Sequence, residues 1–187
     1  RYSQLLDAIR FYKPETIVET GTFNGGRAIL MATVGFENRD TINYIGYDLF
    51  ENASTQLDEI EFNSKPHNTL EVVRKRLQDF AEKFKRKGKI FNFRLTAGDT
   101  KETLQHPVII DTPQDELVIN PSEADFAFID GGHSDATVQH DYKILKDIPV
   151  IVLDDFIHPL DNKKEEAEHY LAVNRLCDTF ENRRKWI

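Results

Sequence analysis

Carboxylate side chains stand at the end of every stretch of this sequence that is expected to form a central β-strand. These residues are Glu19, Asp48, Asp99, Asp130 and the pair Asp154-Asp155. The carboxyl ends of parallel strands meet at one edge of a sheet, where open α/β sheets bind their ligands. Acids gathered at that edge need cations or hydrogen-bond donors to offset their mutual repulsion. This coincidence is the strongest functional signal in the sequence.

A glycine-rich turn follows the first of these acids. Thr16, Ile17 and Val18 are β-branched, which favours a buried strand, and glycines at 21, 25 and 26 then allow a tight turn before a helix. The dinucleotide fingerprint Gly-x-Gly-x-x-Gly is absent, and the carboxylate of Glu19 would repel a pyrophosphate. The turn favours a ligand with positive charge and a ribose, such as S-adenosylmethionine. A purely structural turn with a capping role is the alternative.

Strands alternate with helices along the chain, which predicts right-handed βαβ units. The expected strands are 16–20, 41–48, 89–97, 124–130 and 149–154, with a small extra strand at 108–110. The expected helices are 2–12, 25–35, 68–87, 135–146 and 163–180, with a short one after Asp99. The segments 49–67 and 105–122 are expected to be mainly irregular, the first with room for a short helix. The fold class is therefore α/β: a Rossmann-like, doubly wound, mostly parallel sheet with helices on both faces. Residues 149–154 form an almost continuous apolar run, which predicts burial on both faces of the sheet.

Composition limits the classes of protein that this sequence can represent. A length of 187 residues with 40% hydrophobic and 30% charged residues indicates one globular domain over 1–187. A net charge of −8 argues against nucleic-acid binding, and no apolar run approaches a membrane span. The single cysteine, Cys177, excludes an internal disulfide and a cysteine-based zinc site. A reducing, cytoplasmic setting is the default expectation.

Taken together, the motifs resemble those of class I S-adenosylmethionine-dependent methyltransferases, in the branch that includes metal-dependent sugar and macrolide O-methyltransferases. The matching segments, in the family's order, are 17–26 (IVETGTFNGG), 44–48 (YIGYD), 98–99 (GD), 126–134 (FAFIDGGHS) and 150–155 (VIVLDD). The resemblance implies S-adenosylmethionine as the cofactor. Its methionine part would be held by Glu19 and the turn with Gly21, Thr22 and Gly25. Asp48 would accept hydrogen bonds from the ribose hydroxyls and Asp99 one from the adenine amino group.

The resemblance also implies a divalent metal, with Mg²⁺ expected, at Asp130, Asp154 and Asp155. Asp130 is counted among the catalytic and cofactor-contacting residues as well. Related enzymes carry either a catalytic histidine at the place of His133 or an acid at the place of Gly132, so the sequence favours His133 as the general base. The acceptor would be a small, hydroxylated, sugar-like molecule. The alternatives are that Asp154-Asp155 is a turn with a helix cap, and that His133 caps a helix or contacts the cofactor.

One departure from the family concerns the C-terminus. The class closes its sheet with two further strands, and the sequence ends at Ile187 too soon for both. We expect either truncation or completion of the exposed edge by a neighbouring subunit in a homo-oligomer. Two other functions stay open at this stage: a nucleotide-dependent enzyme such as an oxidoreductase, and a non-catalytic cofactor-binding or interaction domain.

Overall fold

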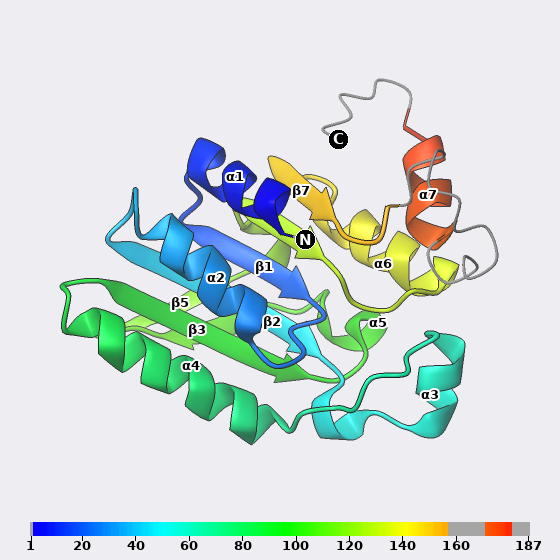
Figure 1. The fold of residues 1–187 in the computed structure, drawn as a ribbon, viewed down its shortest axis with the longest axis horizontal. Coiled ribbons are helices and arrows are strands. Elements are labelled where there is room, and N and C mark those ends of the chain that lie inside the picture. Colours follow the sequence, from blue (N-terminus) through cyan, green and yellow to red (C-terminus); the bar gives the residue numbers. More distant parts are fainter. Residues whose placement is uncertain (1, 157–170, 181–187) are drawn as a thin grey trace.

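The fold is organised around one parallel sheet. The structure is a computed structural model that describes residues 2–156 and 171–180. The sheet has five parallel strands in the order β3-β2-β1-β6-β7 (Figure 1). The strands are β1 (Thr16–Thr20), β2 (Thr41–Asp48), β3 (Ile90–Ala97), β6 (Phe126–Ile129) and β7 (Val150–Leu153). The chain runs outward from β1 to β3 and returns to the other side of β1 with β6. The switch point of a doubly wound sheet therefore lies between β1 and β6, and the predicted Rossmann-like fold is confirmed.

Helices cover both faces of the sheet (Figure 1). They are α1 (Ser3–Tyr12), α2 (Gly26–Gly35), α4 (Leu70–Lys85), α5 (Thr100–Thr103) and α6 (Asp135–Leu145), while α7 (Leu171–Asp178) packs against α6. The first three share one apolar core with the sheet, and α6 contributes to a second core on the opposite face together with Leu104, just after α5. Helix α4 packs on the sheet because its apolar residues Val73, Leu77 and Phe80 recur at helical spacing and form one buried face.

The segment 105–122 is more regular than the sequence predicted. It holds β4 (Val108–Asp111) and β5 (Glu116–Ile119), which pair antiparallel as a separate hairpin. The prediction of a small strand near 108–110 is confirmed, but the irregular reading of 116–119 is wrong. Leu117, Val118 and Ile119 are consecutive apolar residues of which only Ile119 is buried, so they carry no alternating pattern.

The segment after β2 contains the short helices η1 (Phe50–Asn52) and α3 (Thr55–Ile60). Ser54 caps α3, because its hydroxyl accepts a hydrogen bond of 3.2 Å from the backbone N–H of Leu57. Helix α3 lies beside the carboxyl ends of β2 and β3 (Figure 1). The sequence had left room for a short helix here, and this prediction is confirmed.

Two further predictions need comment. Strand β7 was expected to be buried on both faces, but all four of its residues are only half-buried because β7 is the outermost strand of the sheet as described. Of the predicted helix 163–180, residues 171–178 are confirmed as α7, and 163–170 lie outside the described residues. Among the described helices, none is both long and apolar enough to cross a bilayer.

Helix α6 places one acid in the interior. Asp141 is fully buried, and burial raises the pKa of its carboxyl to about 6, although contacts with Thr100, His140 and Thr20 oppose the shift. Because the ordinary pKa of an aspartate is about 3.9, the folded protein binds this proton more tightly than the unfolded chain does. The associated stability is complete below about pH 4 and is lost as the pH rises through the folded-state pKa of about 6.

We therefore expect Asp141→Asn to remove this part of the pH dependence and to stabilise the protein by about 2 kcal/mol near neutral pH. Urea unfolding between about pH 4.5 and pH 7.5 measures the effect. Asp147→Asn, at an exposed position just beyond the same helix, is the matched control. If the Asp141 variant and the wild type lose stability in parallel over this range, the buried carboxyl does not carry the effect.

Candidate functional site

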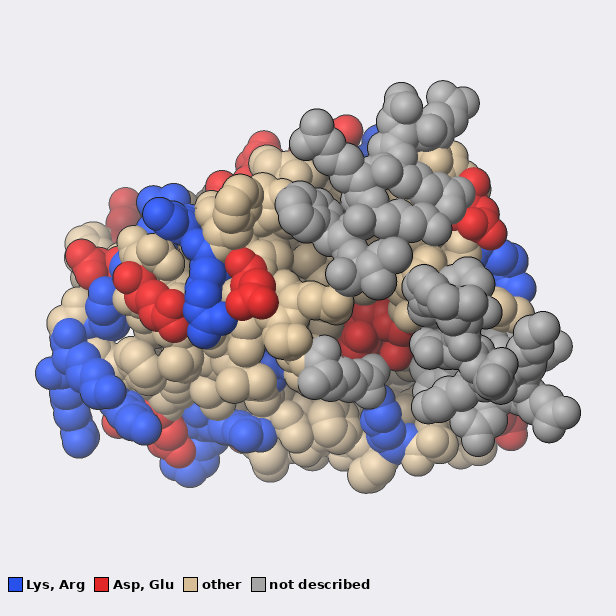
Figure 2. Space-filling view, turned by 45° about the horizontal axis from the view of Figure 1, so that its top comes forward, with Lys and Arg blue, Asp and Glu red and all other residues tan. Residues whose placement is uncertain are grey.

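A cleft opens at the carboxyl ends of the strands, at the switch point of the sheet. Its volume is about 920 Å³ when the open solvent at its mouth is counted. Its lining comes from the ends of four strands, with Gly21, Asp48, Asp99 and Asp130 one from each, and His133 lies in the loop after β6. Figure 2 shows acidic side chains gathered near the middle of one face. The predicted meeting of the strand-end acids is thus observed for these members.

The turn after β1 offers backbone to the cleft. Gly21 has φ +84°, and a Cβ added there would overlap the backbone carbonyl of Asp130, so only glycine allows the ends of β1 and β6 to approach this closely. Thr22 is buried, and its hydroxyl lies 3.2 Å from the Tyr44 hydroxyl in the interior. Gly25, also at positive φ, is the N-cap of α2. Of the predicted contacts in this turn, Gly21 lines the cleft and the side chain of Thr22 points inward.

Asp48 ends β2 at the cleft wall. One oxygen accepts the backbone N–H of Phe23 at 2.7 Å, and the other accepts that of Phe50 at 2.9 Å. A carboxylate has about four acceptor positions, so these two bonds fix its orientation and leave acceptor capacity for two hydroxyls. This geometry suits the two neighbouring hydroxyls of a ribose.

Asp99 follows β3 and caps α5. Its Oδ1 accepts the backbone N–H of Lys101 at 2.9 Å, and its Oδ2 lies 3.4 Å from the Lys101 ammonium. The carboxylate still lines the cleft, 27% exposed. A contact with adenine would therefore be made by a carboxylate that Lys101 already orients.

Arg27 is the functional residue that sequence reasoning missed. Its Nε lies 2.9 Å from Glu19 Oε1, and its guanidinium also pairs with Asp130 and donates to the backbone carbonyl of Gly21. Because Arg27 lies in the first turn of α2, where the helix dipole disfavours a cation, its position in the sequence was a usable signal of a specific acidic partner. Arg27 itself lines the cleft.

Glu19 is fully buried between Arg27 and Tyr44, whose hydroxyl donates a short hydrogen bond to Glu19 Oε2. Burial raises the pKa of Glu19 above its ordinary value against the opposing effects of Arg27 and Tyr44. The pKa of Arg27 is raised in turn, since its two carboxylate partners outweigh the opposing effect of burial. The cation beside Glu19 in this structure is Arg27. Arg27 lines the cleft and Glu19 lies buried behind it, so Glu19 would act on a ligand by way of the Arg27 guanidinium.

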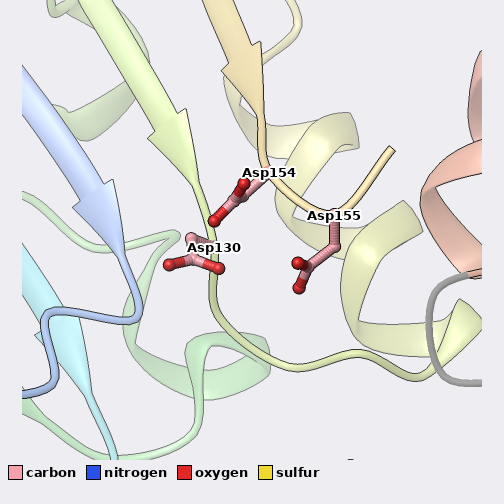
Figure 3. A group of neighbouring side chains, drawn as sticks. All are labelled: Asp130, Asp154 and Asp155. Carbon is pink, nitrogen blue, oxygen red and sulfur yellow. The ribbon is translucent and has the colours of Figure 1, made fainter. Parts of the chain in front are cut away.

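Asp130, Asp154 and Asp155 converge at the ends of β6 and β7 (Figure 3). One oxygen from each lies within 4.8 Å of the other two. Two ligands on opposite sides of a cation are about 4.2 Å apart for Mg²⁺ and about 4.6–5.2 Å apart for Ca²⁺. The three carboxylates therefore fit a hard divalent cation in both donor type and spacing.

The charge of the cluster leads to the same conclusion. Burial raises the pKa of Asp130 to about 8, and although Arg27 opposes the shift, Asp154, Asp155 and Glu19 add to it. The guanidinium alone does not balance this group of acids, so a proton is bound near neutral pH. A divalent cation would supply the missing positive charge.

His133 stands next to this cluster. Its Nδ1 lies 3.3 Å from Asp155 Oδ2, and its side chain is 18% exposed. A carboxylate beside one ring nitrogen favours the tautomer that carries its proton there. The structure thus brings His133 to the cleft beside the predicted metal ligands.

A comparison with protein families identifies the class. A family model described as a methyltransferase domain matches residues 18–156, from β1 to just beyond β7. The chain belongs to this methyltransferase family. The match includes all six strand-end acids, Arg27 and His133. A search of curated proteins gives no match. The predicted methyltransferase class is confirmed, and membership of this family implies S-adenosylmethionine as the methyl donor.

Proposed function

We propose that this methyltransferase transfers the methyl group of S-adenosylmethionine to a hydroxyl oxygen of a small polar acceptor, assisted by a divalent cation. The observation that carries the proposal is the convergence of Asp154 and Asp155 on Asp130, which lines the cleft together with His133. Such an oxygen-donor cluster suits binding of a hard cation and a hydroxylated molecule.

The cofactor's ribose would be held by Asp48, whose two oxygens are already oriented by backbone N–H groups. The exposed backbone of the Gly21 turn would face the methionine part, with Arg27 able to face its carboxylate. When bound, the cofactor supplies an electrophilic methyl group on a positively charged sulfur. The acidic surroundings of the cleft favour that positive charge over a phosphate.

The metal would be held by Asp130, Asp154 and Asp155, and when bound it would lower the pKa of an acceptor hydroxyl. Asp130 would contact two cations, the metal and the guanidinium of Arg27, because one of its oxygens pairs with Arg27. Arg27 thereby fixes the orientation of this carboxylate relative to the turn after β1.

His133 would take the proton of the acceptor hydroxyl. Asp155 favours a proton on Nδ1, which leaves Nε2 as the basic nitrogen. The acceptor oxygen bonds to the methyl carbon as the carbon–sulfur bond breaks, and the electron pair of the broken bond stays on sulfur. The products are an O-methyl ether and neutral S-adenosylhomocysteine, with the proton on His133.

A methyl-acceptor screen tests this proposal. Sugars, nucleosides, catechols and small hydroxy acids are incubated with the protein, S-adenosylmethionine and Mg²⁺, and products are identified by mass spectrometry. We expect a hydroxylated compound to gain the mass of one methylene, and the new O-methyl group to survive mild acid. Methylation confined to nitrogen or sulfur acceptors would contradict the proposal while leaving the methyltransferase class intact.

A further inference from the structure

The cleft is bordered by a segment whose attachment is unusual. We call residues 51–69 the lid segment; it contains α3 and connects η1 to α4. Leu57, Asp58, Asn63 and His67 of this segment line the cleft opposite the loop 131–133. Helix α3 buries none of its residues, and Ile60 and Phe62 are 50% and 48% exposed. Apolar packing therefore does not account for the position of the lid segment.

Glu61 is the only buried residue of the lid segment, all of which is described, with 8% of its surface exposed. The hydrogen bonds among Asp58, Asn63 and His67 lie within the segment, so they shape it without attaching it to the rest of the fold. A carboxylate is costly to bury unless hydrogen bonds offset the lost hydration. Its burial here indicates that the contacts of Glu61 attach the segment.

The hydrogen bonds from Ser134 and Thr137 join Glu61 to the start of α6, and Lys101 of α5 adds an ion pair. Glu61 Oε2 accepts the backbone N–H of Ser134 at 2.9 Å, and Oε1 accepts the hydroxyls of Ser134 at 3.0 Å and Thr137 at 2.5 Å. The ammonium of Lys101 lies 3.4 Å from Oε1. A negative charge is also favoured at the positive end of the α6 dipole.

Gly132 makes room for this carboxylate. A Cβ built at residue 132 would overlap Glu61 Oε2, so a side chain there would displace it. Glu61 therefore binds against the loop that carries Asp130 and His133. These contacts also lower the pKa of Glu61 despite its burial, so it is a poor proton acceptor and not a second candidate base.

We propose that Glu61 is a positioning residue that holds the lid segment closed against the loop 131–134, retaining the cofactor and fixing the orientation of His133. The role deepens the proposed function and rests on it for the effect on the cofactor. The closure itself is a property of the ligand-free fold. It can therefore be tested separately.

Amide hydrogen exchange of the ligand-free protein is the first test, with Glu61→Ala and Glu61→Gln compared with wild type. The control is Glu59→Gln, at an exposed position of α3. We expect exchange in residues 55–63 to accelerate roughly 10-fold or more in Glu61→Ala, since several charge-assisted hydrogen bonds are lost. Glu61→Gln keeps the shape and some hydrogen bonds, so a smaller increase, about 3-fold, is expected. Unchanged exchange in Glu61→Gln, which is the variant least prone to misfolding, would overturn the proposal.

The second test measures dissociation of S-adenosylhomocysteine by surface plasmon resonance. We expect dissociation to become roughly 10-fold faster in Glu61→Ala with little change in association, and Glu61→Gln to restore part of the difference. A uniform loss of folded protein would lower the bound amount without changing the rate. If the wild type binds no S-adenosylhomocysteine, the proposed function fails, and the exchange result alone decides whether Glu61 holds the segment. Dissociation at the wild-type rate in both variants would overturn the role in retaining the cofactor.

Discussion

Replacing Arg27 by leucine is expected to lower the free energy of unfolding by about 3–5 kcal/mol near neutral pH. The change leaves two carboxylates, the fully buried Glu19 and the almost buried Asp130, without the guanidinium that pairs with both. Removing one member of a buried ion pair is far more damaging than removing both, because the remaining acid must either stay charged without a partner or take up a proton in a region of low polarity. Denaturant unfolding measured at constant pH gives the difference directly.

Two comparisons sharpen this result. Arg74→Leu is the matched control, because Arg74 forms an exposed ion pair with Glu71 one helical turn away, where about 0.5 kcal/mol is expected. The double variant Arg27→Leu/Glu19→Gln removes one buried charge together with its partner and should regain part of the lost stability. A loss below about 1 kcal/mol in Arg27→Leu would mean that water or a structural shift replaces the guanidinium.

Asp154→Asn, or addition of EDTA to the wild type, is expected to reduce turnover about 1,000-fold while S-adenosylhomocysteine binding changes less than about 3-fold. The separation follows from the geometry, since Asp154 is part of the acidic cluster and the carboxylate proposed to bind the ribose is Asp48 on another strand. Initial rates with an acceptor from the screen measure the first quantity. Mn²⁺ binding followed by electron paramagnetic resonance gives a readout that needs no acceptor.

The control for this experiment is Asp147→Asn, which changes an exposed acid outside the cleft and should leave rates and Mn²⁺ binding unaltered. Turnover that persists in EDTA, together with wild-type Mn²⁺ binding by Asp154→Asn, would assign Asp154 and Asp155 a structural role. The methyltransferase assignment would survive that outcome, because it rests on the family match and the fold.

The strand ends show what sequence patterns can predict. Apolar stretches ending in acids are local features, and once βαβ alternation is recognised the topology of the sheet brings their ends together. The role of Gly21 was predictable for the same reason, since the tight turn between a buried strand and a helix favours a residue that can adopt positive φ. The order of the strands then sets the switch point and, with it, the location of the cleft.

Partner choice between distant residues was not predictable from those patterns. The sequence treated Glu19 as a ligand for a cofactor cation, and the structure pairs it with Arg27 eight residues later. Glu61 lay in a segment without readable periodicity, yet it meets Ser134 across 73 positions of sequence. Both pairings depend on which side chains three-dimensional packing leaves buried, and a carboxylate's burial is not encoded in its neighbours along the chain.

The position of a strand within the sheet and the formation of a short hairpin were equally unpredictable from the sequence. An apolar run such as 150–153 has the same composition whether its strand lies inside or at the edge of the sheet, and among the described strands it is the outermost one. Similarly, among the described strands β5 pairs with β4 alone, so its identity as a strand depends on the turn at 112–115. In that turn the Thr112 hydroxyl donates to the Asp115 carbonyl at 2.6 Å. Short elements of this kind are stabilised by tertiary contacts more than by their own sequence.

Calorimetric titration of S-adenosylhomocysteine into the wild type and into Asp48→Ala tests the central claim most directly. We expect saturable binding by the wild type and about 100-fold weaker binding by the variant, because two hydrogen bonds to a charged carboxylate are lost. Asp79→Ala, at an exposed site of α4, should bind like the wild type. The thermal midpoints of all three proteins show whether Asp48→Ala also destabilises the fold, because Asp48 accepts hydrogen bonds from two backbone N–H groups. No binding by the folded wild type, or equal affinity in Asp48→Ala, would contradict the assignment of this cleft to the cofactor.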